Sequence, residues 1–276
     1  MEILLFISLI LIGFFISFIC SMVGLGGGIL FIPILILVYK ISSQMAVGIS
    51  ILAMTATTTS ATIGYFKYKC VDWKLGIIYD ILDIPGVMIG AYITTLISNI
   101  ILEIICGLAI IILGLSVIFQ KKSEKDQNST NIRNNYIKSE LINEKSENFK
   151  EKIDYSYAWR GKRLKYALIS SFLGGLITGM VGLGGGITDT TTMILLGVPI
   201  NVAAGSSSFA MLLTNITGFL SHSFLGNINL ALGISLAIGA FIGAQFGSHI
   251  AIKVNKNILR KILAIIAIFS GIRLLI

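Results

Sequence analysis

The sequence has few charged residues and few cysteines. Only 12% of its 276 residues are charged, which is about half the fraction that a soluble domain carries. The three cysteines, Cys20, Cys70 and Cys106, lie far apart and form no Cys-x-x-Cys pair. This spacing favours neither a disulfide framework nor a thiolate metal site. We interpret the cysteines as small apolar packing residues.

Motifs for catalysis and for cofactor binding are also missing. The sequence contains no His-Glu-x-x-His, no phosphate-binding loop and no recognisable pairing of a nucleophile with a base. The glycine run that begins at Gly24 is not a dinucleotide fingerprint, because Ile29 stands where a third glycine is required and no strand precedes the run. We therefore expect no enzyme activity, no cofactor and no bound metal.

The net charge of +8 does not indicate a nucleic-acid partner, because the excess is concentrated in one stretch. Lys121 to Lys165 holds 12 basic and 7 acidic residues, so it contributes +5 of the total. A basic excess confined to one loop between apolar segments is typical of a cytoplasmic connection in a membrane protein.

Long apolar segments fill most of the remaining sequence. Hydrophobic residues make up 55% of the whole chain. The segments predict an all-α polytopic membrane protein whose solvent is the lipid bilayer of the cell membrane. The segment at Ile3–Met22 lacks a basic leader and a small-residue cleavage site, so we expect it to be a retained span. The ten segments are Ile3–Met22, Gly28–Tyr39, Met45–Phe66, Leu75–Ile97, Ile100–Phe119, Leu164–Val181, Gly186–Val198, Val202–His222, Asn229–Ile250 and Ile258–Ile276.

These segments form two sets of five. We expect residues 1–119 to be a first transmembrane repeat, 120–163 a polar cytoplasmic linker and 164–276 a second repeat. The linker is rich in Asn, Lys, Glu and Ser, a composition that cannot bury enough apolar surface to fold alone.

A glycine run recurs in the two sets. The stretch from Gly24 to Gly28 reads Gly-Leu-Gly-Gly-Gly and returns from Gly182 to Gly186, each time after Met-Val and before Ile. The segment after the first run has 12 residues, about 18 Å of helix against a hydrocarbon core of about 30 Å. Short, glycine-interrupted segments at matching places in two halves indicate the binding site of a transporter.

Each run is expected to expose the unpaired N–H groups and the positive end of the following helix, and so to form half of an anion site. The alternative is that the glycines merely permit a tight turn or a close helix crossing. Other features of the repeat support a duplication, including Gly86 to Ala91, which matches Gly239 to Ala244 with a small-xxx-small pattern.

The basic residues of equivalent loops differ between the halves. The loop between the third and fourth segments carries three lysines, whereas its equivalent in the second half carries none. The loop before the tenth segment carries Lys253 and Lys256, whereas its equivalent at Ser98 and Asn99 has no basic residue. Opposite charge in equivalent loops predicts two repeats of inverted topology, five crossings each, with both termini outside.

Hydroxyl and amide side chains cluster at matched positions of the third and eighth segments, and hydroxyls follow the second glycine run. Neutral donors of this kind can replace water around an anion, although Ser and Thr in membrane helices often bond back to a carbonyl of the preceding turn. The candidate substrate-binding residues are Gly24, Gly26, Gly27, Gly28, Thr57, Thr58, Gly182, Gly184, Gly185, Gly186, Thr188, Ser206, Ser207, Thr214 and Asn215.

Acidic residues inside apolar segments are functional candidates, because a buried charge is costly. Asp83 and Asp189 are candidates for proton coupling or for binding a cation. The alternative for Asp189 is a helix N-cap. Asp80 and Glu103 lie near the ends of their segments, so we expect them to be solvated.

These motifs resemble the TauE/SafE family of membrane permeases, also called the 4-toluene sulfonate uptake permease family. The resemblance covers both halves and rests on the two glycine runs, on Pro33, on Gly205-Ser206-Ser207 and on Gly239 to Ala244. Thr191 departs from it, since it stands where a proline opposite Pro33 is expected. The resemblance implies a secondary permease for a small sulfur-containing anion such as sulfite or an organosulfonate, without an ATP-binding part.

We therefore expect a transporter that holds this small anion between the two glycine runs. An anion channel and, less favoured, an intramembrane enzyme that uses Asp83 and Asp189 are the alternatives. The identity of the anion, the direction of transport, the coupling ion and the oligomeric state are left open by the sequence.

Overall fold

The computed structural model describes residues 2–23, 26–67, 71–119, 162–184, 189–190, 192–193, 198, 200–250 and 256–275. In these ranges the regular structure is helical, which confirms the all-α prediction. The helices are α1 (Glu2–Val23), α2 (Gly28–Leu37), α3 (Ser43–Lys67), α4 (Trp73–Leu96), α5 (Asn99–Phe119), α7 (Lys162–Val181), α9 (Ile200–Phe224), α10 (Leu230–Ile250) and α11 (Lys256–Leu275).

Each of these helices coincides with one predicted apolar segment to within two residues at either end. The seventh segment, Gly186–Val198, and the linker up to residue 161 fall wholly or largely outside the described residues.

Four described helices are both long enough and apolar enough to cross a membrane, namely those over Ile3–Met22, Ser43–Lys67, Asn99–Ser116 and Leu230–Gly247. The outer faces of the bundle are apolar as well: Leu4 and Ile100 are each 72% exposed and Phe269 is 64% exposed. A continuous apolar exterior of this kind is suited to lipid and not to water.

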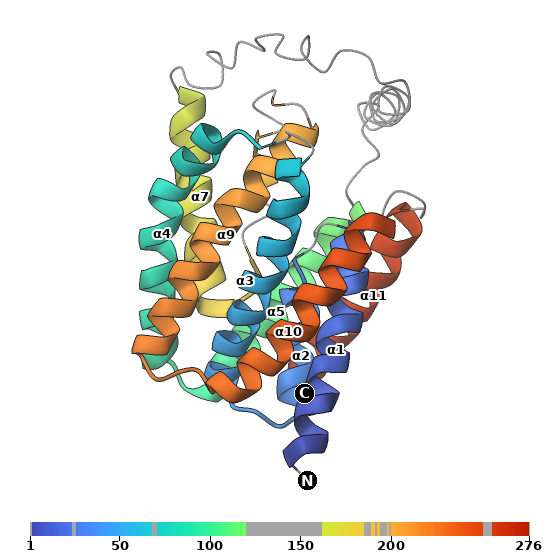
Figure 1. Ribbon diagram of the computed structural model, residues 1–276. Helices are drawn as coiled ribbons and strands as arrows, with labels where there is room; N and C mark the ends of the chain where they lie inside the picture. The colour runs from blue at the N-terminus through green and yellow to red at the C-terminus, as the bar shows by residue number, and fades with distance from the viewer. Residues whose placement is uncertain are drawn as a thin grey trace.

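Helix α3 lies in the middle of the bundle in Figure 1, where it packs against α9 and α10 and also against α2. Helices α4, α7 and α9 form one side of the bundle. Helices α1, α2, α5, α10 and α11 form the other side. The closest helix pairs are α1 with α10 and α4 with α7, followed by α3 with α10, α5 with α11, α3 with α9 and α4 with α9.

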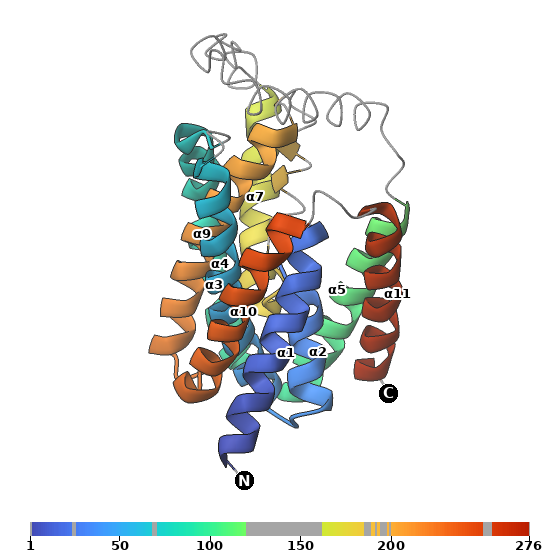
Figure 2. The same ribbon diagram turned by 45° about the vertical axis from the view of Figure 1, so that its right-hand side comes forward.

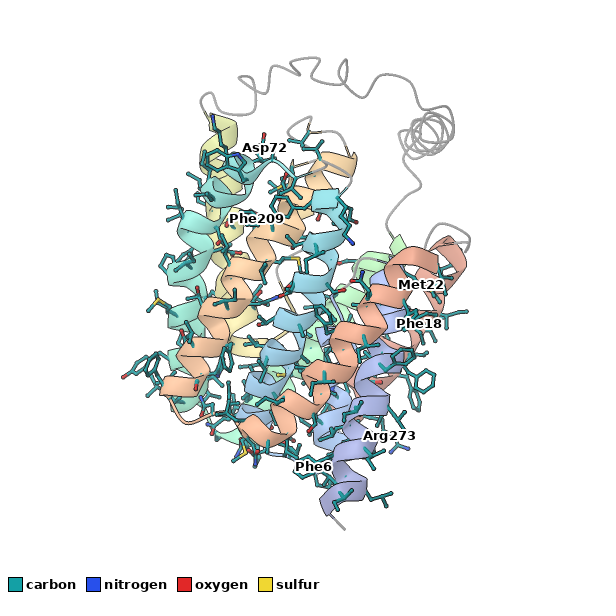
Figure 3. The ribbon with its side chains drawn as sticks, viewed as in Figure 1. Phe6, Phe18, Met22, Asp72, Phe209 and Arg273 are labelled. Atoms are coloured by element: carbon teal, nitrogen blue, oxygen red, sulfur yellow. The ribbon has the colours of Figure 1, made fainter. Side chains whose placement is uncertain are left out.

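The two chain ends lie at the same end of the bundle (Figures 1 and 2). Asp72, at the start of α4, lies at the opposite end (Figure 3). Along α1, Phe6 lies near the end with the termini and Met22 lies toward the other end, whereas on α11 Arg273 lies back near the first end. Helices α1 and α11 therefore run in opposite directions.

The small-xxx-small pattern does bring helices into close contact, as predicted. A Cβ atom added at Gly239 or Gly243 of α10 would collide with the carbonyl oxygens of Ile10 and Phe14 on α1. A Cβ atom at Gly86 or Gly90 of α4 would collide in the same way with backbone of α7. In both pairs the absence of a side chain lets backbone pack against backbone.

Helix α2 is short and central. Its 10 residues, Gly28 to Leu37, give a length of about 15 Å, half the thickness of the hydrocarbon core. Most of its residues are buried, Pro33 included. A helix that is apolar on all sides must be buried, and here the surrounding helices bury it.

Candidate functional site

The two glycine runs touch each other inside the bundle. A Cβ atom added at Gly28 would collide with the carbonyl oxygen of Gly182 and would lie 3.0 Å from the Cα atom of Leu183. The backbone is left-handed at Gly26 and Gly27, with φ of 69° and 94°, and at Gly182 and Gly184, with φ of 64° and 79°. Residues with a side chain rarely adopt this conformation, which explains the glycines. Gly24, Gly185 and Gly186 lie outside the described residues.

Helix α3 binds a carbonyl of each run. The hydroxyl of Ser50 donates to the carbonyl oxygen of Gly182 at 3.1 Å. The hydroxyl of Thr57 lies 3.1 Å from the carbonyl oxygen of Gly26 and shares its proton between that oxygen and the carbonyls of Met54 and Ala53 in its own helix, at 2.9 Å and 3.3 Å. Ser50 and Thr57 are seven residues apart, so they lie on one face of the helix. Thr58 donates to the same Met54 carbonyl, at 2.8 Å, and contacts neither run. The backbone-bonding alternative therefore accounts for the Thr58 hydroxyl proton.

The first run also leaves a helix N-terminus without a side-chain cap. Gly27 is the N-cap of α2 and no side chain caps the helix there. The N–H groups of Leu30 and Phe31 bond to the carbonyl of Gly27, so the groups before them are the ones available to a ligand.

Two methionines lie beside the runs. Cβ atoms built at Gly28 and Gly184 would lie 2.6 Å and 3.3 Å from the sulfur of Met54. Cβ atoms built at Gly26 and Gly184 would lie 3.4 Å and 3.5 Å from the terminal methyl of Met211. Met54 and Met211 are equivalent in the internal repeat, but as apolar residues in apolar helices they gave no sequence signal of a site.

A second polar cluster joins α4 to α9. The Thr214 hydroxyl contacts carboxyl oxygens of both Asp80 and Asp83, the latter at 2.9 Å. Both acids are 1% exposed. The expectation that Asp80 is solvated is therefore wrong. Helix α4 begins at Trp73, capped by Asp72, which places Asp80 two turns into the helix and against α9.

Asp189 extends this cluster from the second glycine run. It is 1% exposed, and neither of its carboxyl oxygens has a hydrogen-bond partner in the described part of the chain. The N-cap alternative thus finds no support there. Its carboxyl group is near enough to Asp83 and Asp80 to interact with them electrostatically.

Asn215 connects the two polar regions. It is 1% exposed, and its side-chain nitrogen donates to the Thr58 hydroxyl at 3.5 Å, the upper limit of a hydrogen bond. Asn215 follows Thr214, which holds the acids, and Thr58 follows Thr57, which holds the first glycine run. Thr57, Thr58, Thr214 and Asn215 are all among the candidate substrate-binding residues, and this contact brings the pair on α3 next to the pair on α9.

The remaining predicted hydroxyls of α9 have hydrogen bonds of their own. Ser206 accepts a hydrogen bond from the backbone N–H of Asp72 at 2.9 Å, at the start of α4. Ser207 accepts one from the hydroxyl of Thr190 at 2.8 Å. Thr188 lies outside the described residues. Within the described ranges, no group of three His, Cys, Asp or Glu side chains is placed to hold a metal ion.

A bundle of apolar helices, with a short buried helix and two backbone breaks that meet at its centre, is the architecture of a membrane transporter. Comparison with known proteins identifies the group within that class. The chain belongs to the sulfite exporter TauE/SafE family, whose model matches residues 9–274. It is therefore a multi-pass membrane protein of a transporter family and not an enzyme.

Curated relatives match along nearly the whole chain. The probable membrane transporter protein YunE of Bacillus subtilis is 30% identical over 98% of this chain and 97% of its own. The probable membrane transporter protein YjnA of the same organism is 23% identical over 98% of this chain and 99% of its own. A probable membrane transporter protein of Haemophilus influenzae is 25% identical over 94% of this chain and 91% of its own. No solved structure matches the chain.

Proposed function

We propose that the protein is a secondary permease for a small sulfur-containing anion such as sulfite or an organosulfonate. The anion is held near the middle of the membrane, between the glycine run at Gly26 to Gly28 and the run at Gly182 to Gly184. The observation that carries this proposal is the direct contact of the two runs beside the uncapped N-terminus of α2.

The chemistry of this region suits an oxyanion. Backbone N–H groups at a helix N-terminus attract a negative charge without a buried cation. The hydroxyls of Thr57 and Ser50 contact the carbonyls of the two runs, so the donors left for an anion are the backbone N–H groups at the start of α2. Met54 and Met211 supply polarisable apolar contact around the oxygens. Asp83 and Asp189 are the candidates for coupling transport to protons.

We infer that the two halves are inverted repeats and that transport proceeds by rocking one against the other. The helix contacts support this inference. Exchanging each helix with its repeat equivalent turns the α1–α10 pair into the α7–α4 pair and the α3–α10 pair into the α9–α4 pair. The same exchange leaves the α3–α9 and α5–α11 pairs unchanged. Residues 1–119 and 164–276 then form the two repeats.

We propose that the linker at 120–163 is cytoplasmic and that both termini are outside. The prediction is tested with single cysteines at Lys74 and Lys256, in a background where the three native cysteines are alanine. A membrane-impermeant maleimide should label both positions from the cytoplasmic side alone, because inverted repeats place both lysines inside. Labelling of Lys256→Cys from outside would contradict the inverted arrangement.

The substrate is tested by binding to the purified protein. Sulfite, thiosulfate, isethionate and acetate are titrated, and we expect the sulfur oxyanions to bind at least about 10-fold more tightly than acetate. Downhill and uphill flux into liposomes then separate a permease from a channel, because only a coupled permease accumulates the anion against its gradient. A preference for acetate would overturn the substrate class, and flux that is only downhill would indicate a channel.

A further inference from the structure

The contacts of Thr214 constrain the protonation of Asp80 and Asp83. One hydroxyl has a single proton to donate and two lone pairs with which to accept. Its oxygen nevertheless lies within hydrogen-bond distance of a carboxyl oxygen of Asp80 and of one of Asp83. Two ionised carboxylates cannot both be satisfied by one proton. One carboxyl must therefore carry a proton and donate it to Thr214, while Thr214 donates to the other.

The surroundings of the pair point to the same conclusion. Asp83 packs against Ser171 and Gly175 of α7, and both Asp83 Oδ1 and Asp80 Oδ2 lack a hydrogen-bond partner among the described residues. Two adjacent carboxylates in a buried site repel each other unless a proton lies between them. No cationic side chain of the described residues pairs with either acid.

An independent observation comes from Asp189. This carboxyl group is buried, neither of its oxygens has a hydrogen-bond partner in the described part of the chain, and it is near enough to Asp83 and Asp80 to interact with them electrostatically. A negative charge at that place opposes an anion held between the runs. Protonation of the acids and binding of the anion are therefore linked in the favourable direction.

Few other titratable groups of the described residues lie on the helices around this site. On α9, His222 is buried, with its Nε2 at 2.8 Å from the carbonyl oxygen of Gly179. Gly179 packs against Val87 and Ala91 of α4. These residues lie one to two turns after Asp83, on the side away from Asp80. Helix α7 brings Ser171, which is uncharged. Asp72 and Lys74 lie at the start of α4, two turns before Asp80.

We propose that Asp80, Thr214 and Asp83 form a binding site for one proton, with Asp189 as the group that connects it to the anion site. The proposal rests on the proposed function for its role in transport but not for its chemistry. The proton enters with the anion and leaves with it. For a monovalent sulfonate the net charge moved is then zero, so the membrane potential does not drive the step.

Infrared difference spectroscopy of the purified protein at neutral pH tests the proton site without any substrate. We compare the carbonyl band of protonated carboxyl groups in wild type with that in Asp80→Asn, Asp83→Asn and the double variant. In each single variant the intensity of this band should fall by the amount that one protonated carboxyl group contributes. The reason is that the remaining acid can ionise and accept a hydrogen bond from Thr214. The double variant should lose no more than either single one. Asp72→Asn, at the half-buried N-cap of α4, is the matched control and should lose nothing.

Each other outcome overturns the site. An unchanged band in both single variants means that neither acid is protonated. A double-variant loss equal to the sum of the two single losses means that each acid holds its own proton. Thr214→Val adds a readout of the bridge itself, since the band should shift to the frequency of a carboxyl without that hydrogen bond.

The role in transport is tested with isethionate in liposomes, because a sulfonate stays anionic and cannot itself carry the proton. An inward acid gradient should drive accumulation by wild type at a rate that a potassium diffusion potential does not change. Asp80→Asn should lose at least about 10-fold of the accumulation. Failure of wild type to move isethionate would count against the proposed function, whereas accumulation by Asp80→Asn at the wild-type level would count against this coupling site.

Discussion

Replacing Gly26 or Gly184 by valine is expected to reduce anion transport about 100-fold while the protein stays folded in the membrane. Both glycines have left-handed backbone, with φ of 69° and 79°. A β-branched residue is strained there by at least about 1 to 2 kcal/mol, and the backbone relieves the strain by rotating. Rotation at Gly26 turns away the carbonyl that Thr57 holds and the N–H groups that follow it. A displacement of about 1 Å in a binding constellation costs about 100-fold in rate.

Steric space favours this outcome over unfolding. The nearest atom to a Cβ at Gly26 is the terminal methyl of Met211 at 3.4 Å, and at Gly184 it is the sulfur of Met54 at 3.3 Å. Both atoms belong to flexible side chains. The measurements are uptake of radiolabelled substrate into liposomes and size-exclusion behaviour in detergent.

Gly226 offers a matched control for the same substitution. Its φ is 76° and a Cβ there would meet nothing within 4 Å, in the turn after α9. Gly226→Val therefore imposes similar backbone strain away from the proposed site and should keep most of the transport. If Gly26→Val and Gly184→Val also kept wild-type transport, the glycine runs would not form the anion site.

Hydrophobic patterning predicted the helices closely, because in a bilayer the length of an apolar stretch is set by the membrane. The predicted ends of Leu75–Ile97 differ by two residues and one residue from those of α4. The glycine runs were also found, since five glycine-rich positions repeated inside apolar sequence have no helical explanation. The sequence indicates that the two runs meet, and the structure shows where they do so, at Gly28 and Gly182.

Side-chain direction was the part that the sequence could not give. Asp80 was expected to be solvated from its distance to a segment end, but solvation depends on which face of α4 it occupies, and that face packs against α9. Ser206 is predicted to bind substrate because it belongs to the cluster of hydroxyls in the eighth segment. Adjacent residues of a helix point about 100° apart, and Ser206 binds the backbone of Asp72 instead. The sequence does not distinguish Met54 as a site residue, because a methionine in an apolar helix resembles any residue of the hydrophobic core.

Replacing Gly243 or Gly90 by leucine is expected to have a large effect of a different kind, a loss of thermal stability. A Cβ at Gly243 collides with the carbonyl of Phe14 and lies 2.9 Å from its Cα atom. A Cβ at Gly90 collides with the carbonyl of Leu176 and lies 2.9 Å from the backbone nitrogen of Met180. No rotamer change moves backbone atoms aside, so the cost should reach or exceed about 3 kcal/mol, the upper end for overpacking.

The matched control is Gly64→Leu in α3, where a Cβ meets nothing within 4 Å. That variant should keep or slightly raise the wild-type stability, since leucine favours a helix more than glycine does. Thermal unfolding in detergent measures these stabilities. We expect the unfolding temperature of Gly243→Leu and of Gly90→Leu to lie about 6 to 12 °C below that of wild type. Gly243 of α10 faces α1 as Gly90 of α4 faces α7, so repeats related by inversion should give similar losses at both positions. If the unfolding temperature fell for only one of the two variants, the two helix crossings would differ in energy. The internal symmetry would then hold for the course of the backbone but not for the packing.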